Sequence, residues 1–467
     1  MTDELWRRGA CDLAGLIAKG AVSSEEVVTA HHERIEAVNP ALNAVTVVLA
    51  ESALAAARRA DQCAAGEPLG VFHGVPFTIK ENIDVEGSAT TQGVPALADA
   101  VASTDSPIVE RMRAAGAIPI GRTNLPDFGL RVHTDSSLRG LTRNPWNRDL
   151  TAGGSSGGEA SALASGMTPV GLGNDIGGSL RNPAHCCGIA SLKPSMGRVP
   201  SATVIPPVDD FLAGQLMATD GPMARTVADV RVAYRVIAGP HVRDPFTVPV
   251  PLDLPQPEGV LRVALLPDPP GADTDAGIAD VVRRAGDHLA DAGYDVVEAV
   301  PPAFAETADV WAAWLLTEVR AIMPMLMQVM GPDALTFLGH ADAHIPACDT
   351  TQFVHTLIER HAIARMWAEF QAEHPLLVLP VWNQPPFKHG WDMASFDNAV
   401  ATLDIIRPVL PANLLGLPAA VVPGGLSGGM PVGVQVVGNR YREDLVLDAA
   451  AAIERAVGVL TPVDPAG

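Results

Sequence analysis

Residues 151–194 read TAGGSSGGEASALASGMTPVGLGNDIGGSLRNPAHCCGIASLKP, a stretch dominated by glycine, alanine and serine. Residues this small let backbone segments approach one another closely, which is typical of a tightly packed core. Two serines lie in glycine-rich surroundings, Ser155 in GGSSGG and Ser179 in DIGGSLR, 24 residues apart. Glycines before a serine allow backbone N–H groups to converge, and such a group can bind an oxyanion. A flexible linker at Ser155 and a plain tight turn at Ser179 are the alternatives.

Residues 153–157 also match G-x-S-x-G, the nucleophile elbow of α/β-hydrolases. That elbow directly follows an apolar strand, whereas the preceding residues 143–150 (RNPWNRDL) are typical of a loop. A phosphate-binding P-loop needs Gly-Lys-Ser/Thr after its glycines, and none follows here. The sequence therefore favours neither an elbow nor a P-loop at Ser155.

Short apolar runs and helical patterns alternate on both sides of this stretch. Such alternation predicts an α/β layer architecture. We expect an α/β/α sandwich around a large mixed β-sheet. We expect helices over much of the first 65 residues, where Ser23 and Glu26 form a capping box. Further helices are expected at about 50–64, 107–115, 157–166, 276–292, 303–330 and 350–373, and strands at 75–79, 117–120, 261–266, 294–300 and 376–381.

We expect residues 1–467 to form a single domain. Its predicted parts are N-terminal helices in 1–65, a catalytic core in 70–240 and 400–460, and a variable substrate lid at about 300–395. The segment 240–257 contains six prolines, so a boundary between two domains there is the alternative.

Composition excludes several classes of protein. Apolar residues make up 48% of the chain and charged residues 18%, which permits a large core and excludes general disorder. The net charge of −21 argues against the basic surface that nucleic-acid binding requires, so we expect no nucleic-acid partner. Residues 408–439 carry no charge but are rich in proline and glycine, which predicts buried strands and turns and no membrane segment. Five cysteines without a CxxC pair, and no apolar leader, favour the cytoplasm.

Lysine is rare in this chain. Of the 32 basic residues only four are lysines, namely Lys19, Lys80, Lys193 and Lys388. Lys80 directly follows the apolar run VPFTI. Arginine stays protonated, whereas a buried lysine can lose its proton and act as a base. Taken alone, Lys80 is better explained as a surface lysine that snorkels or pairs with Glu81 or Asp84.

Taken together, Lys80, Ser155 and Ser179 resemble the amidase signature family of serine hydrolases. The blocks VPFTIKEN, GGSSGGE and DIGGSLR match the family's motifs, with the two serine blocks at the family's spacing. Further matches are GIASLKPS at 188–195, GPMARTVAD at 221–229 and NLLGLPAAVVPGGLSGGMPVGVQVVG at 413–438. The resemblance covers most of residues 25–455.

The resemblance implies a role for each of these residues. Ser179 would be the nucleophile, Ser155 a bridging serine after a cis peptide bond, and Lys80 the base. The oxyanion hole would be formed by the N–H groups of Ile176, Gly177, Gly178 and Ser179. The implied reaction is hydrolysis of amide C–N bonds through an acyl-enzyme, with ester cleavage as a side activity. We expect no metal and no cofactor, a small-molecule amide, ester or carbamate as substrate, and a monomer or homodimer.

Several alternatives stay open. The same machinery would serve a carbamate (urethane) hydrolase, or the A-type subunit of a tRNA-dependent amidotransferase. Residues 199–216 (VPSATVIPPVDDFLAGQL) depart from the serine-rich, aromatic run of that subunit, which favours stand-alone hydrolysis. A binding module without catalysis is disfavoured because all three catalytic residue types are present.

Other side chains could supply rival chemistry. His185 is a second candidate base, and Cys186 and Cys187 could be reactive thiols, although core packing is favoured for all three. His340 and His344 lack the glutamate of an HExxH zinc motif, so no metal site is predicted. Methionines 323, 325, 327 and 330 could line an apolar pocket, with ordinary core packing again favoured.

Overall fold

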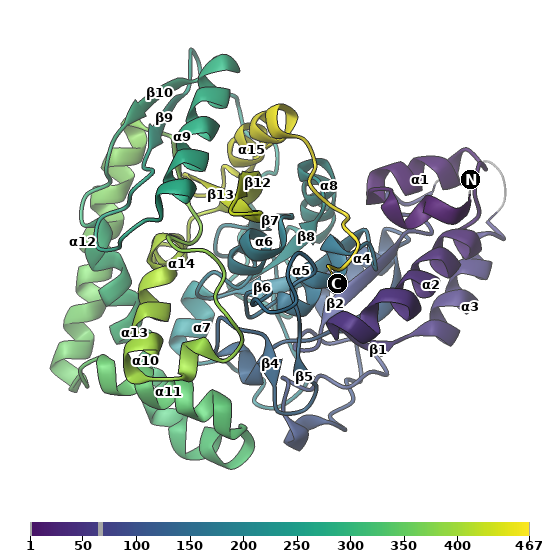
Figure 1. The fold of residues 1–467 in the computed structure, drawn as a ribbon, viewed down its shortest axis with the longest axis horizontal. Coiled ribbons are helices and arrows are strands. Elements are labelled where there is room, and N and C mark those ends of the chain that lie inside the picture. Colours follow the sequence, from purple (N-terminus) through teal and green to yellow (C-terminus); the bar gives the residue numbers. More distant parts are fainter. Residues whose placement is uncertain (1, 64–68, 467) are drawn as a thin grey trace.

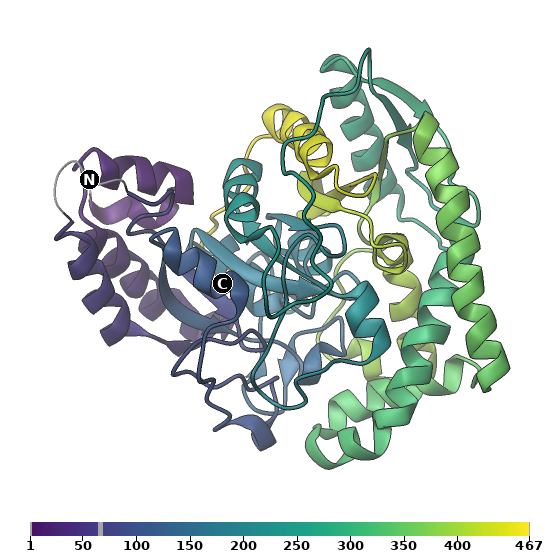
Figure 2. The ribbon, with the colours of Figure 1, turned by 180° about the vertical axis from the view of Figure 1, so that it is seen from behind.

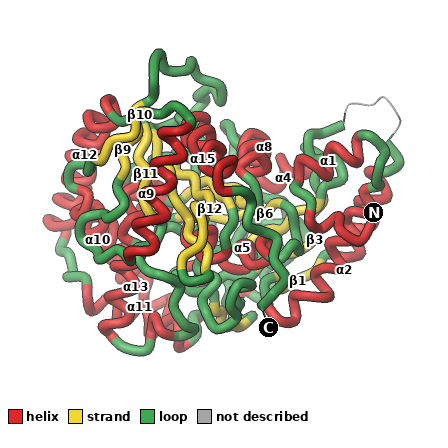
Figure 3. The backbone as a smooth tube through the Cα atoms, turned by 45° about the horizontal axis from the view of Figure 1, so that its top comes forward, coloured by secondary structure: helices red, strands yellow, loops and turns green. Residues whose placement is uncertain are grey.

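The computed structural model describes residues 2–63 and 69–466. One sheet of eleven strands runs through the described part of the chain (Figures 1 and 3). Its strands lie in the order β1 (Val45–Val48), β3 (Ile118–Thr123), β2 (Pro76–Lys80), β6 (Val170–Asp175), β8 (Thr219–Ala224), β7 (Ala190–Lys193), β12 (Ala419–Ser427), β13 (Met430–Gly438), β11 (Leu376–Pro380), β9 (Arg262–Leu265) and β10 (Asp295–Glu298).

The sheet is mixed. Strands β3, β2 and β6 are parallel to one another, as are β11, β9 and β10, and antiparallel pairs join these two groups through the centre. Strands on both sides of the proline-rich segment 240–257 therefore belong to the same sheet. On this continuity we propose that the chain forms a single domain.

Helices cover both faces of the sheet, because its central strands are apolar on both sides. One core cluster combines the sheet with α5 (Gly157–Ala164), α6 (Arg181–Cys187), α10 (Phe304–Val329) and α14 (Leu410–Leu414). The other combines it with α4 (Pro107–Ala114), α8 (Val227–Ile237), α9 (Ala276–Asp291) and α15 (Glu443–Val457). Figure 2 shows these layers from behind. The predicted α/β/α sandwich around a mixed sheet is confirmed.

The N-terminal region forms α1 (Ala10–Ala18), α2 (Ser24–Leu42) and α3 (Ala50–Ala60) beside β1 (Figure 1). The predicted capping box of Ser23 and Glu26 is present at the start of α2. Strand β1 was not predicted: its four residues add an edge strand antiparallel to β3. The end of the helix expected at 50–64 lies partly outside the described residues.

The region predicted as a lid, at about 300–395, contains α10, α11 (Pro332–His344) and α12 (Thr350–Glu373), together with β11. Helix α10 is long and apolar enough to span a membrane, yet it packs against α12 and α14 and buries Trp314 fully. Of the four methionines on this stretch, Met330 is buried, whereas Met325 and Met327 are 41% and 65% exposed. The prediction that all four methionines pack in the core is therefore wrong, because the end of α10 reaches the surface.

Candidate active site

Lys80 is the last residue of β2 and is completely buried. Its Nζ atom lies 2.7 Å from Ser155 Oγ and 2.6 Å from Asn174 Oδ1. Asn174 belongs to β6, which pairs in parallel with β2, so the carboxyl ends of both strands meet at this point. An amide oxygen only accepts hydrogen bonds, so Asn174 directs one N–H of the lysine towards itself. Another position on Nζ faces the Ser155 hydroxyl.

Burial lowers the pKa of Lys80 from its usual value to about 7. The carboxylates of Asp175, Asp220 and Glu159 act in the opposite direction, because negative charge favours the ammonium form. An amine with this pKa is neutral in a large fraction of molecules near neutral pH. Lys80 can therefore accept a proton, as a general base must.

Two of those carboxyl groups, Glu159 and Asp220, have a raised pKa. Burial raises the pKa of Glu159 to about 7. The hydroxyl groups of Thr78 and Thr123 donate hydrogen bonds to this carboxylate and act in the opposite direction (Thr123 Oγ1 lies 2.8 Å from Glu159 Oε2). Burial also raises the pKa of Asp220 to about 7. Asp220 lies on β8 directly opposite Asn174, so it faces the same end of the sheet as Lys80. The charge of Lys80 lowers the pKa of both carboxyl groups, and their negative charge raises the pKa of Lys80.

Ser155 follows a cis peptide bond, Gly154–Ser155, as the resemblance implied. It is 2% exposed and lies in a tight turn that ends at α5. The Thr134 hydroxyl donates to the Gly153 carbonyl over 2.8 Å and accepts from the Gly157 N–H over 3.1 Å, which ties both sides of the turn together. Gly154 has no room for a side chain, because a Cβ would lie within 2.8 Å of the backbone of residues 131–133.

Ser179 lies in the turn between β6 and α6, beside the Ser155 turn, and is 6% exposed. The Ser156 N–H donates to the Ser179 carbonyl over 3.3 Å, which joins the two turns. Between the Ser155 and Ser179 hydroxyls themselves, no hydrogen bond is formed in the part of the chain that the structure describes. The structure thus brings Lys80 and Ser155 into direct contact and places Ser179 in the adjacent turn.

The turn that carries Ser179 is built around Asp175. The carboxylate accepts from the N–H groups of Gly178 (2.7 Å) and Leu180 (3.1 Å) and from two nitrogens of Arg181 (3.0 Å each). Burial opposes ionisation, but the Arg181 guanidinium outweighs it and holds the pKa of the Asp175 carboxyl well below its usual range. The Asn413 amide adds a further bond to this carboxylate over 2.8 Å.

This arrangement corrects one part of the predicted oxyanion hole. The Gly178 N–H donates to Asp175, so it is not free to bind an oxyanion in this structure. For Ile176, Gly177 and Ser179, no hydrogen bond from the amide N–H to another described residue is formed. These three donors remain the candidates for an oxyanion hole.

The rival residues have structural roles instead. His185 is buried, and its Nδ1 accepts from the Gly433 N–H over 3.0 Å. Burial lowers its pKa to about 4, and Trp382 packs beside its ring. Burial raises the thiol pKa values of Cys186 and Cys187 well above their usual range, so both thiols stay protonated. Among the described residues, no group of histidines, cysteines and carboxylates is arranged to hold a metal.

Sequence analysis missed Asn174, Asn182 and Asn413 as parts of the site. Asn182 Nδ2 donates to the carbonyls of Gly154 (3.3 Å) and Gly177 (3.1 Å), and so links the two serine turns. Asn174 directly precedes the DIGGSLR block and Asn182 directly follows it, and that position was the available signal. Asn413 lies 238 residues from its partner Asp175, and the available signal was its place at the start of the matching block 413–438.

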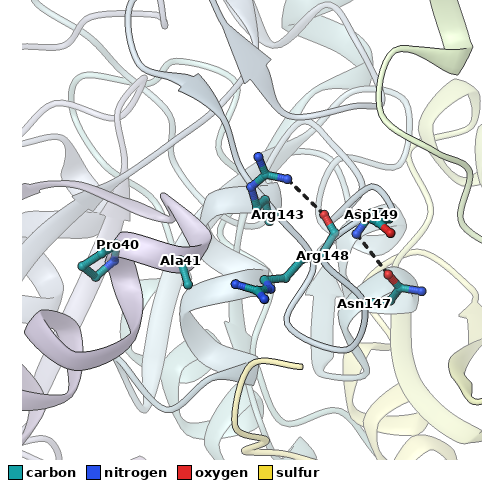
Figure 4. A pocket seen from close by; sticks show the side chains of 6 residues that line it. All are labelled: Pro40, Ala41, Arg143, Asn147, Arg148 and Asp149. Carbon is teal, nitrogen blue, oxygen red and sulfur yellow. Dashed lines mark hydrogen bonds between the residues drawn. The ribbon is translucent and has the colours of Figure 1, made fainter. Parts of the chain in front are cut away.

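A surface pocket of about 360 Å³ lies elsewhere, where the end of α2 faces the loop before the Ser155 turn (Figure 4). It is lined by Pro40, Ala41, Arg143, Asn147, Arg148 and Asp149. None of the candidate catalytic residues lines it, and we assign the chemistry to the buried Lys80 cluster instead.

Comparison with known proteins decides the family. The family model Amidase matches residues 26–447. The chain belongs to the amidase family. The resemblance inferred from the motifs is thereby confirmed, and this amidase is an enzyme that acts on amides.

Its relatives cover nearly the whole chain. Indoleacetamide hydrolase of Bradyrhizobium diazoefficiens is 43% identical over 462 residues, which is 98% of this amidase and 88% of that protein. The A-type subunit of glutamyl-tRNA(Gln) amidotransferase from Salinispora arenicola is 32% identical, with 99% of each chain covered. A structure of 6-aminohexanoate cyclic dimer hydrolase complexed with substrate matches with a TM-score of 0.84 at 30% identity, covering 97% of this amidase and 98% of that chain.

Proposed function

We propose that this amidase hydrolyses amides through an acyl-enzyme on Ser179, with Ser155 as proton relay and Lys80 as base. The observation that carries the proposal is the position of Lys80 Nζ, buried between Asn174 Oδ1 and Ser155 Oγ with its pKa lowered to about 7. A hydroxyl is a weak nucleophile until a neighbouring base takes its proton. A neutral buried amine in contact with a serine hydroxyl meets that requirement.

In the first half of the reaction, Ser179 Oγ attacks the substrate carbonyl carbon. Its proton passes to Ser155, and the Ser155 proton passes to Lys80 Nζ. The carbonyl oxygen becomes an oxyanion facing the N–H donors of the turn. The relay then runs backwards: Lys80 returns the proton through Ser155 to the substrate nitrogen, the C–N bond breaks, and ammonia or an amine leaves.

In the second half, water attacks the ester carbonyl of the acyl-enzyme. Lys80 accepts the water proton through Ser155, and the collapsing intermediate releases the acid while Ser179 recovers its proton. Every step uses side chains and backbone groups of the chain itself, so we propose that no metal or cofactor takes part.

We propose a small primary amide with an aromatic acyl group as the substrate, with indole-3-acetamide as the compound to test first. The 43% identity to indoleacetamide hydrolase over 98% of the chain supports this choice. We also propose a cytoplasmic location, supported by the five free cysteines among the described residues.

The test is ammonia release from indole-3-acetamide by the purified chain alone. We expect turnover, and a loss of about 10⁴-fold or more in Ser179→Ala and Ser155→Ala. Ser191→Ala is the matched control, because Ser191 is buried on β7 and its hydroxyl has no partner among the described residues. Phenylacetamide, an acetanilide and an alkyl carbamate complete the panel. Activity that required added partner proteins would favour the amidotransferase role instead, since a relative of that kind is 32% identical.

A further inference from the structure

Trp311, on α10, contacts the Ser179 turn from outside the motif blocks. Its indole Nε1–H donates to the Ile176 carbonyl over 2.8 Å, and the side chain is 6% exposed. The ring lies flush against Gly177, where a Cβ would stand 2.7 Å from Trp311 Cζ2. Glycine at 177 is therefore required by the approach of this tryptophan.

The hydrogen bond to Ile176 determines where the Gly177 N–H points. The Ile176 carbonyl and the Gly177 N–H belong to one planar peptide group, and in a trans peptide they point in opposite directions. This peptide is not among the cis bonds of the described chain. A donor that holds the carbonyl on one side therefore directs the N–H to the other side, where it meets no described partner.

The next peptide group is held in the same way by different residues. Asn182 Nδ2 donates to the Gly177 carbonyl, and Trp382 Nε1 donates to Asn182 Oδ1 over 3.0 Å, which fixes the orientation of the amide. The Gly178 N–H on the opposite side then points to Asp175. The two peptides are thus locked independently, and only the first has its N–H left free.

We propose that Trp311 is a positioning residue for the oxyanion hole: it aims the Gly177 N–H at the oxygen on which negative charge develops. The proposal rests on Ser179 being the nucleophile, as proposed above. It places a determinant of catalysis on α10, in the region outside the serine and lysine motifs.

The test variant is Trp311→Phe, which keeps an aromatic ring over Gly177 and removes the N–H donor. The matched control is Trp367→Phe, because Trp367 is also buried and its indole N–H also donates to a backbone carbonyl, that of Pro302, over 3.0 Å. The oxyanion is present in the tetrahedral intermediate and develops in the transition states around it, but not in the bound substrate. We therefore expect kcat for the amide to fall about tenfold, the value of one hydrogen bond. Substrate affinity, measured with Ser179→Ala present to prevent turnover, should stay within about twofold of the Ser179→Ala value.

A boronic acid that forms a tetrahedral adduct with the serine supplies a second measurement. Its affinity should fall in Trp311→Phe by the same factor as kcat/KM and should not change in Trp367→Phe. Equal effects of the two variants, or a loss confined to substrate affinity, would overturn the positioning role. If the wild-type chain formed no boronate adduct at Ser179, the proposed function would be wrong and the inference would fail with it.

Discussion

Replacing Asp175 by asparagine should destabilise the turn that carries Ser179. Oδ2 of the carboxylate accepts from the Leu180 N–H and from Arg181 Nε, and Oδ1 accepts from Gly178, Arg181 and Asn413. The asparagine amide has an NH₂ group in place of one carboxylate oxygen, and this group cannot accept a hydrogen bond. In the Oδ2 position it would face two donors, and in the Oδ1 position three. At least two hydrogen bonds are lost either way, at about 1 kcal/mol each, and the Arg181 charge is left buried without its carboxylate.

Breaking a buried ion pair costs about 3–5 kcal/mol, so we expect the free energy of unfolding of Asp175→Asn to fall by about that amount. Urea denaturation followed by circular dichroism measures the change, and amide turnover should be lost in parallel. Asp448→Asn is the control, since it breaks a half-exposed pair with Arg231 and should cost less than about 1 kcal/mol. A loss below about 1 kcal/mol in Asp175→Asn would refute the reasoning.

Three further predictions concern the base and its surroundings. Lys80→Arg should abolish amide cleavage, because arginine stays protonated, whereas Lys388→Arg at the surface should leave kcat unchanged. Wild-type kcat/KM should rise with pH through an apparent pKa near 7, since protonated Lys80 cannot accept a proton. Asp220→Asn removes a carboxyl group whose negative charge favours the ammonium form of Lys80, so this rise should move to lower pH. A profile that did not move would contradict the coupling. Dialysis against EDTA should leave the rate unchanged, and activity lost there but restored by zinc would contradict a purely proteinaceous mechanism.

Local patterns predicted most of the fold. The helices and strands that were expected from residue 75 onward fall close to their positions, because each apolar run or helical stripe is buried where it stands. The same holds for the site: Lys80 and Ser155 were identified from short blocks and meet in the structure. The central strands β6, β7 and β8 were not among the expected elements. Strand β1 was missed because four residues between two helices give too short a pattern.

Long-range contacts were beyond this kind of reasoning. Trp311 reaches Ile176 over 135 residues, and Trp382 reaches Asn182 over 200. Nothing next to either tryptophan in the sequence indicates a partner in the serine turns. The role of Gly178 was misjudged for a related reason, since only the folded turn shows its N–H directed at Asp175.

The most direct test of the central claim is to map the covalent adduct. The purified chain is treated with a fluorophosphonate, digested, and analysed by mass spectrometry. We expect one adduct, on the peptide containing Ser179, absent from Ser179→Ala and strongly slowed in Lys80→Met, which has no base to accept the proton. An adduct on Ser155, or equally rapid labelling of Lys80→Met, would contradict the mechanism.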